Sequence, residues 1–270
     1  MPVRSSPTLE ELVHGLILAA GCGSRLGTRS PKCLVRMGGR PLLQIQLDIL
    51  SRAGVDDVSI VVGYRHEEVR AAAFGQATFV HNKRFFETNS LYSYHLARSL
   101  IKSDLVVLNS DVLFPLEMLE RLLQVPGSSL AFDSASGEDE EHMKVQLRNG
   151  QLIAMSKDMS PARVDGENVG LLHLAESAAQ ASFDAAARLI ADGHQHDWLG
   201  SAVSAIAGAH DISGIDVAGL PWVEIDYPQD LALARSQVWP TIQALELFAE
   251  RRRGMVSSRA VADARNAAAG

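Results

Sequence analysis

The sequence predicts a single α/β domain with three layers, in which helices cover both faces of a mostly parallel sheet. Short apolar runs alternate with helical patterns along the chain, as in proteins built from βαβ units. The 270 residues suffice for one substantial core, and a hydrophobic fraction of 47% is typical of globular chains. We expect residues 14–253 to form this domain, between an N-terminal extension (1–13) and a mobile C-terminal tail (254–270).

The elements follow in order from their periodicity. A buried strand over residues 16–20 runs into a glycine-rich loop, and a helix follows Pro41 up to Gly54. The sequence Asn149-Gly150 joins two alternating segments, 144–148 and 151–155, and predicts a β-hairpin with a type I′ turn. The other expected strands cover 58–62, 78–81, 104–110, 130–133, 171–174 and 222–226, and the other expected helices cover 66–73, 90–101, 113–123, 177–192, 197–206 and 228–253.

The charge distribution narrows the class of protein. A net charge of −7 argues against a protein that coats nucleic acid. Residues 25–40, in contrast, carry only basic charges, so an anionic ligand is attracted to one place. No apolar run approaches the length of a membrane span, and the two cysteines suggest neither zinc nor a disulfide framework. We expect a cytoplasmic protein without a membrane or nucleic-acid partner.

The loop over residues 21–32 has the composition of a phosphate site. Its glycines at 21, 23 and 27 let backbone N–H groups approach a triphosphate. Arg25 can bond to two phosphate oxygens at once, whereas Lys32 acts as a point charge. Because Pro31 disfavours a helix through Ser30, we expect Lys32 on an extended segment that folds back over the loop.

Three other interpretations of this loop fit less well. A Walker loop ends in Gly-Lys-Ser/Thr, whereas Gly27 precedes Thr28 here. The third glycine comes one residue too late for the Rossmann fingerprint, and no acidic residue lies at a strand end about twenty positions on. A lipoprotein signal ending at Cys22 would need an apolar core, which acidic residues at 10 and 11 interrupt.

Two carboxylates follow or end predicted strands. Asp111 comes directly after 104–110, and Asp226 ends 222–226. Ligands of open α/β sheets bind beyond the carboxyl ends of the strands, so both residues are candidate Mg²⁺ ligands. The structural alternative is that Asp111 caps a turn and that Asp226 caps the helix beginning near Pro228.

Residues 18–32, LAAGCGSRLGTRSPK, closely resemble the signature LAAGxGxRLG followed by PK of the GT-A-like nucleotidyltransferases. Later segments are similar to the phosphocholine, inositol phosphate and phosphonate cytidylyltransferases of that superfamily, and the resemblance covers roughly residues 14–235. The group typically has an Asn-Asn pair where this chain has Thr88-Asn89, so the resemblance gives weaker support for a contact between residue 88 and the nucleotide base. The similar segments are 89–93, 143–145, 156–157, 166–170 and 222–230.

The resemblance implies Mg²⁺-dependent transfer of CMP from CTP to a small phosphate or phosphonate, such as choline phosphate or 2-aminoethylphosphonate, with release of pyrophosphate. Arg25 and Lys32 would be the catalytic groups, and Asp111 and Asp226 the metal ligands. The attacking oxygen is already ionised, so no general base is needed. Gly63 and Tyr64 are further candidates for nucleotide binding because they follow a predicted strand. The full set of expected nucleotide-binding residues is Leu18, Ala19, Ala20, Gly21, Cys22, Gly23, Gly63, Tyr64, Asn82, Asn89, Ser90 and Ser110.

A cationic acceptor would favour carboxylates and aromatic faces around its head group. Lys144 and Lys157 lie near opposite ends of the predicted hairpin and could both reach one pocket. The candidate acceptor-binding residues are Tyr92, Asp133, Lys144, Lys157, Glu167 and Trp198.

Two alternatives to this function stay open. A sugar-1-phosphate uridylyl- or guanylyltransferase usually carries a longer sugar-binding insertion and often a C-terminal β-helix, which nothing after Arg253 could form. A regulatory nucleotide-binding module would have a degenerate site. The chain instead keeps all four expected site residues, Arg25, Lys32, Asp111 and Asp226, which counts against this alternative. The sequence leaves the oligomeric state open, a homodimer included.

Overall fold

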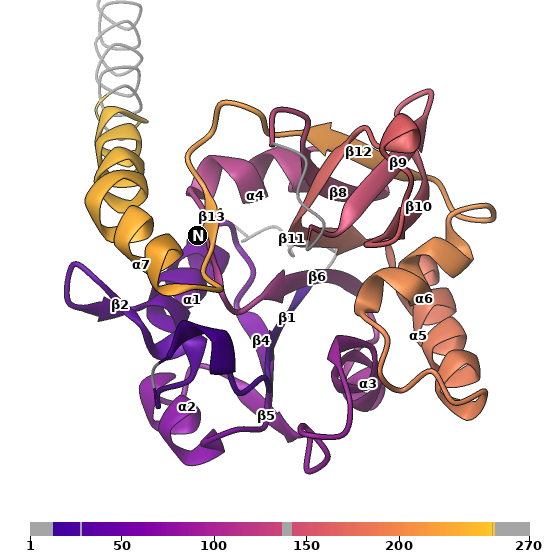
Figure 1. Ribbon diagram of the computed structural model, residues 1–270, viewed down its shortest axis with the longest axis horizontal. Helices are drawn as coiled ribbons and strands as arrows, with labels where there is room; N and C mark the ends of the chain where they lie inside the picture. Colours follow the sequence, from indigo (N-terminus) through magenta and orange to yellow (C-terminus); the bar gives the residue numbers. More distant parts are fainter. Residues whose placement is uncertain (1–12, 28, 137–141, 250, 252–270) are drawn as a thin grey trace, which may run out of the picture.

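One nine-stranded sheet runs through the middle of the protein (Figure 1). The computed structural model describes residues 13–27, 29–136, 142–249 and 251. Residues 1–12 of the expected extension, the expected tail and the acidic stretch 138–141 lie outside this part of the chain. In their order across the sheet, the strands are β5 (Thr78–His81), β4 (Asp57–Val62), β1 (Val13–Ala19), β6 (Asp104–Asn109), β11 (Gly166–Leu174), β8 (Ser128–Asp133), β12 (Ile212–Asp216), β10 (Gln151–Ser156) and β9 (Lys144–Arg148).

The sheet is mixed, which corrects the expectation of a mostly parallel one. Strands β5, β4, β1 and β6 are parallel, whereas β11 is antiparallel to both β6 and β8. Strand β11 begins beside the end of β8, with Glu167 opposite Asp133, and the described residues between these two strands form only the β9–β10 hairpin and a 3-10 turn. Because no helix carries the chain back to the other end of the sheet, as a parallel connection requires, β11 runs antiparallel to β8.

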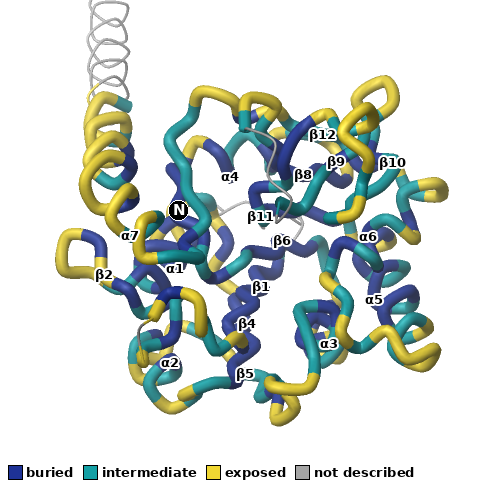
Figure 2. The backbone as a smooth tube through the Cα atoms, in the orientation of Figure 1, coloured by how far each residue is buried: buried dark blue, intermediate teal, exposed yellow. Residues whose placement is uncertain are grey.

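Helices cover both faces of the sheet, as the sequence predicts. Each face has its own apolar core. Strands β4, β1, β6, β11 and β8 between the two cores are mostly buried, whereas β5, β12, β10 and β9 are mostly half-buried (Figure 2). On the second face Tyr94 stacks on Phe183 with ring centroids 4.2 Å apart, which joins two helices. The helices on the first face are α1 (Leu42–Arg52), α2 (His66–Ala72), α4 (Leu116–Leu123) and α7 (Pro228–Leu233), and those on the second are α3 (Ser90–Leu96), α5 (Glu176–Ala191) and α6 (Leu199–Ile206).

Several element boundaries differ from the sequence predictions. The helix expected from residue 113 begins at Leu116, because β7 (Val112–Leu113) pairs instead with β13 (Val223–Glu224). The helix expected over 90–101 ends at Leu96 and continues as a 3-10 turn. Strand β12 was not expected, since its sequence ISGID has a weak apolar pattern. Helix α7 continues through a π-helical turn (Ala234–Val238) into residues 239–249.

Two turns behave as their residue types predict. Asn149 and Gly150 have φ of 53° and 77°, as a type I′ hairpin turn between β9 and β10 requires. A second hairpin joins β2 (Arg36–Met37) to β3 (Arg40–Pro41) through Gly38-Gly39.

Strand β11 changes partner along its length, and this shapes the centre of the sheet. Its first residues pair with β9, and its last four pair with β6. The change falls at Gly170, whose φ is 84° and where a Cβ atom would lie 2.7 Å from the Asn109 amide nitrogen. Only glycine fits this close approach at positive φ.

Candidate active site

A cleft of about 770 Å³ lies at the carboxyl ends of β1 and β6. The glycine loop after β1 forms one wall, and β11, β10 and the start of α6 form the far end. The segment 222–230, which runs from β13 into the start of α7, borders it as well. The cleft thus lies where open α/β sheets bind ligands.

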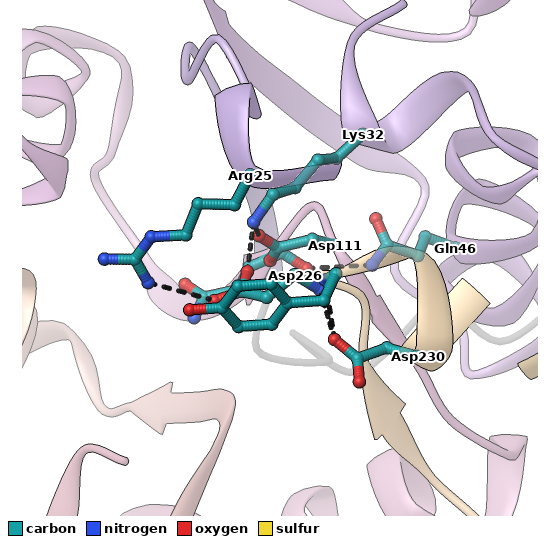
Figure 3. A network of polar contacts seen from close by, with 8 residues as sticks. Arg25, Lys32, Gln46, Asp111, Asp226 and Asp230 are labelled. Carbon is teal, nitrogen blue, oxygen red and sulfur yellow. Dashed lines mark hydrogen bonds and ion pairs between the residues drawn. The ribbon is translucent and has the colours of Figure 1, made fainter. Parts of the chain in front are cut away.

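Lys32 lies among the carboxylates of this cleft (Figure 3). Its Nζ is 3.0 Å from Asp111 Oδ2 and also bonds to Asp226 Oδ1. Arg25 Nη1 lies 3.8 Å from Asp226 Oδ2, and its guanidinium is 5.9 Å from the centre of the Tyr227 ring. Burial alone would lower the pKa of Lys32, but the two aspartates outweigh it and raise that pKa. The ammonium therefore stays charged.

The backbone around Lys32 explains why the loop needs its glycine at 23. Gly23 has φ of 60°, and a Cβ there would lie 2.7 Å from Lys32 Cγ. The stem of Lys32 thus crosses directly over the loop. The expectation of an extended segment is wrong at this residue: Pro31 is extended, but Lys32 begins a 3-10 helix (Lys32–Leu34).

Glu224 joins the two expected metal ligands, and sequence reasoning gave it no role. Oxygen atoms of Asp111, Glu224 and Asp226 lie within 4.8 Å of one another. Glu224 arrives there because β13 pairs with β7, directly after Asp111. Burial, together with the charges of the two aspartates, raises the pKa of Glu224 to about 8. Clustered carboxylate oxygens are the ligands that Mg²⁺ prefers, so this donor set fits that ion.

Asp226 does not serve as the cap of α7, which was its structural alternative. Its carboxylate faces Lys32 and Arg25, while Asp230 Oδ2 accepts hydrogen bonds from the backbone N–H of Asp226 (3.0 Å) and Tyr227 (2.7 Å). Asp230 therefore fixes the backbone that carries Asp226 (Figure 3).

Gln46 supports the turn that carries Asp111 by hydrogen bonds to its backbone. It is fully buried on α1, and its Nε2 donates to the carbonyl oxygens of Asn109 and Val112, both at 2.9 Å. The Ile225 N–H bonds to the Asp111 carbonyl at 2.9 Å and ties the two carboxylate segments together. The buried Oε1 of Gln46 has no hydrogen-bond partner within the described chain. In the sequence, an amide side chain among the apolar residues of α1 is the feature that could have indicated a special role for Gln46.

Cys33 borders the cleft but is not a nucleophile. Its side chain is buried, and burial raises the pKa of the thiol to about 12 with a further contribution from Asp111. The thiol is uncharged at neutral pH. The chemistry here therefore relies on charge and position.

Most of the expected nucleotide-binding residues line the cleft, although their role stays a prediction. Asn82 is engaged locally: its Nδ2 donates to Thr88 Oγ1 and Ser93 Oγ, and its Oδ1 accepts from the Arg84 N–H. Asn89 likewise accepts from the Ser90 N–H. The expected residues that line the cleft are Leu18, Ala19, Ala20, Gly21, Gly23, Asn82, Asn89, Ser90 and Ser110.

Cys22, Gly63 and Tyr64 are not among the described residues that line the cleft. Gly63 packs behind the loop, where a Cβ would lie 2.5 Å from the Ala20 carbonyl oxygen. The Tyr64 N–H bonds to the same oxygen at 3.1 Å, and its hydroxyl bonds to the Arg29 carbonyl oxygen at 3.3 Å. Gly63 and Tyr64 thus support the loop from outside.

The expected acceptor residues divide in the same way. Lys157, Glu167 and Trp198 line the far end of the cleft, whereas Tyr92, Asp133 and Lys144 are not among its described lining residues. Glu167 is buried, with an oxygen 3.1 Å from His142 Nδ1.

Lys144 and Lys157 lie at the same end of the hairpin, so the prediction of opposite ends is wrong. Ser156 pairs with Lys144, which places both lysines at the open end away from the Asn-Gly turn. Lys144 Nζ donates to the Lys157 carbonyl oxygen at 2.6 Å.

A glycine loop with an adjoining arginine and lysine, set beside strand-end carboxylates in a mixed α/β sheet, is the arrangement expected of the GT-A-like nucleotidyltransferase domains. The comparisons with known proteins agree. The chain belongs to the family of MobA-like NTP transferase domains, whose model matches residues 15–262.

Among curated proteins, the chain is similar to CMP-5'-(3-aminopropyl)phosphonate synthase of Streptomyces rubellomurinus, with 33% identity over 237 residues, 81% of this chain and 37% of that protein. It is also similar to the bifunctional IPC transferase and DIPP synthase of Rubrobacter xylanophilus, with 28% identity over 86% of this chain and 53% of that protein. The choline-phosphate cytidylyltransferase of Haemophilus influenzae is 32% identical over 52% of this chain and 61% of that protein. The chain thus spans only about a third to three fifths of these relatives.

Solved structures share the fold. CTP:phosphocholine cytidylyltransferase from Streptococcus pneumoniae superposes with a TM-score of 0.68 at 21% identity, covering 82% of this chain and 96% of that one. The inositol-1-phosphate CTP transferase from T. maritima gives a TM-score of 0.69 at 22% identity, covering 85% and 94%. None of the described helices is long and apolar enough to cross a membrane.

Proposed function

We propose that this protein transfers CMP from CTP to a small phosphate or phosphonate acceptor and releases pyrophosphate in a Mg²⁺-dependent reaction. The observation that carries the proposal is the position of Lys32, across the glycine loop and bonded to both Asp111 and Asp226. A triphosphate in the loop would meet cations on one side and metal-binding carboxylates on the other. Relatives named for CTP or CMP chemistry support cytidine as the nucleoside.

The residues of this chain would position the substrates and neutralise their charge. Backbone N–H groups of the loop and the Arg25 guanidinium would hold the phosphates, and Lys32 would leave the carboxylates to face an oxygen that becomes more negative. An ionised acceptor oxygen forms the new bond to the α-phosphorus. The bond from that phosphorus to the α,β-bridging oxygen breaks, and its electron pair leaves with pyrophosphate. No proton needs to be removed from the nucleophile.

Asp111, Glu224 and Asp226 would hold the magnesium ion. When bound, Mg²⁺ would neutralise charge on the nucleotide near the reacting phosphorus. Asp230 and Gln46 would keep two of these carboxylates in place through the backbone bonds described above.

The acceptor is a small molecule with a phosphate or phosphonate group. An aminoalkylphosphonate has the support of the relative from Streptomyces rubellomurinus, which matches 81% of this chain. Choline phosphate has the support of a relative that matches 52%.

The test is pyrophosphate release with Mg²⁺ and each of CTP, UTP, GTP and ATP, against choline phosphate, 2-aminoethylphosphonate, inositol phosphate and hexose-1-phosphates. We expect release with CTP and one small acceptor. Release only with UTP or GTP and a sugar phosphate would move the protein to the sugar nucleotidyltransferases. No release with any pair would favour a binding module instead.

A further inference from the structure

One wall of the cleft consists of uncharged side chains. The residues of the segment 82–93 that line the cleft are Asn82, Phe85, Thr88, Asn89, Ser90 and Ser93. The far end of the cleft, in contrast, has ionisable lining residues in His142, Lys157 and Glu167. An acceptor carries a charged phosphate or phosphonate group, whereas a nucleobase is flat and uncharged. The uncharged wall therefore suits the base, and the far end suits the acceptor.

Phe85 lies on this wall beside the start of the glycine loop. Its side chain is half-buried and borders the cleft. It packs directly on Gly63, where a Cβ atom would lie 2.7 Å from Phe85 Cβ and 2.5 Å from the Ala20 carbonyl oxygen. The rings of Phe86 and Tyr64 lie next to it, with centroids 4.1 Å and 6.2 Å from that of Phe85. The ring is thus held in place where the loop begins.

The neighbouring polar side chains of this wall bond to one another. The Asn82 amide donates to Thr88 Oγ1 at 3.1 Å and to Ser93 Oγ at 3.0 Å, and its Oδ1 accepts from the Arg84 N–H at 2.9 Å. The Thr88 hydroxyl donates to the Arg84 carbonyl oxygen at 2.8 Å. Asn82 is only 1% exposed. The ring of Phe85 offers a base a contact that breaks none of these hydrogen bonds.

We infer that Phe85 is a substrate-binding residue whose ring packs against the base of the bound nucleoside triphosphate. With the phosphates in the glycine loop, the base lies along the uncharged wall, and the far end of the cleft stays open for the acceptor. The inference rests on the proposed function and deepens it, because it assigns a place to the base of the same nucleotide.

The physical reason is that a base stacks on an aromatic side chain through its flat face. Every base has such a face, so this contact contributes affinity and does not choose among bases. An aliphatic side chain of similar size can fill the space beside Gly63 but lacks the aromatic ring.

The test compares CTP with inorganic triphosphate, which has no base and reaches only the phosphate site. Dissociation constants are measured by calorimetry in the presence of Mg²⁺. Phe85→Leu should weaken the binding of CTP by about tenfold, because the stacking contact is lost. The same variant should bind inorganic triphosphate as wild-type protein does, since the glycine loop and its cations are unchanged.

Two further variants separate this effect from a general loss of packing. Phe85→Tyr keeps the aromatic ring and should restore most of the affinity for CTP. Phe74→Leu changes a phenylalanine that is 78% exposed and not among the described residues lining the cleft, and it should bind both ligands as wild type.

Three results would overturn the inference: unchanged CTP affinity in Phe85→Leu, equal losses of affinity for CTP and inorganic triphosphate, or a loss in Phe85→Tyr as large as in Phe85→Leu. The assay measures binding without an acceptor. A protein that binds CTP through Phe85 but releases no pyrophosphate would therefore contradict the proposed function and leave this inference standing.

Discussion

The Lys32 ammonium lies beside the cluster of carboxylates formed by Asp111, Glu224 and Asp226. This ammonium bonds to both aspartates and so neutralises part of their negative charge. A magnesium ion held by the same oxygens must displace this ammonium. Its displacement would release the Lys32 ammonium toward the phosphates of the nucleotide.

Lys32→Ala should therefore have two opposite effects. Turnover should fall at least about tens-fold, because the charge that develops on the triphosphate loses its counter-charge. Without nucleotide, Mg²⁺ should raise the melting temperature of Lys32→Ala more than that of wild-type protein, because three carboxylates are left without their ammonium. Pyrophosphate release and thermal unfolding measure the two effects, with Lys102→Ala as the control. This role would be contradicted if Mg²⁺ raised the melting temperature of the variant and of wild-type protein equally, or if the turnover of the variant were unchanged.

Asp111→Asn should abolish Mg²⁺-dependent binding of CTP. The amide has no charge and is a weaker ligand for Mg²⁺, and the bond with Lys32 loses its ionic character. Calorimetry with and without Mg²⁺ measures the loss. The control Asp192→Asn lies on the exposed end of α5 and should behave as wild type. If CTP binding by Asp111→Asn depended on Mg²⁺ as in wild-type protein, Asp111 would only cap the turn.

At the scale of elements, the carboxylate site is assembled from segments that are distant in sequence. Pairing of β7 with β13 brings Glu224 beside Asp111, and Gln46 of α1 anchors the turn between β6 and β7. The site is thus held by backbone hydrogen bonds on more than one side. Such anchoring is what a site that binds a small, hard cation requires.

Gln46→Leu should weaken both the fold and the metal site. It leaves the buried carbonyl oxygens of Asn109 and Val112 without their donor, at a cost of about 1–3 kcal/mol in the free energy of unfolding. A positioning role further predicts a higher Mg²⁺ concentration for half-maximal CTP binding under conditions in which the variant is folded. Urea unfolding and magnesium titrations measure the two effects. A stability loss with unchanged magnesium dependence would reduce Gln46 to a purely structural residue.

For the whole molecule, the features that the sequence could predict are those encoded locally. The apolar run into glycines, the basic residues at 25 and 32 and the strand-end carboxylates all lie within single segments. The three-layer α/β architecture followed from periodicity in the same way.

The remaining features depend on pairings that no local pattern contains. The antiparallel direction of β11 follows from its start beside the end of β8, and Glu224 gains its place only through the pairing of β13 with β7. Asp133 and Tyr92 were expected to bind the acceptor. In the structure, Asp133 accepts a hydrogen bond from Trp222, and the Arg84 guanidinium lies over the Tyr92 ring. Side-chain partners of this kind are fixed by the tertiary structure.

In the proposed reaction, the α-phosphate of CTP moves to the acceptor as part of CMP. The most direct measurement uses CTP labelled at the α-phosphate, with Mg²⁺ and 2-aminoethylphosphonate or another acceptor that supports pyrophosphate release. We expect the label to appear in a CMP conjugate of the acceptor and to be absent from pyrophosphate. Label found only in free CMP, or transferred only from UTP or GTP to a sugar phosphate, would contradict it.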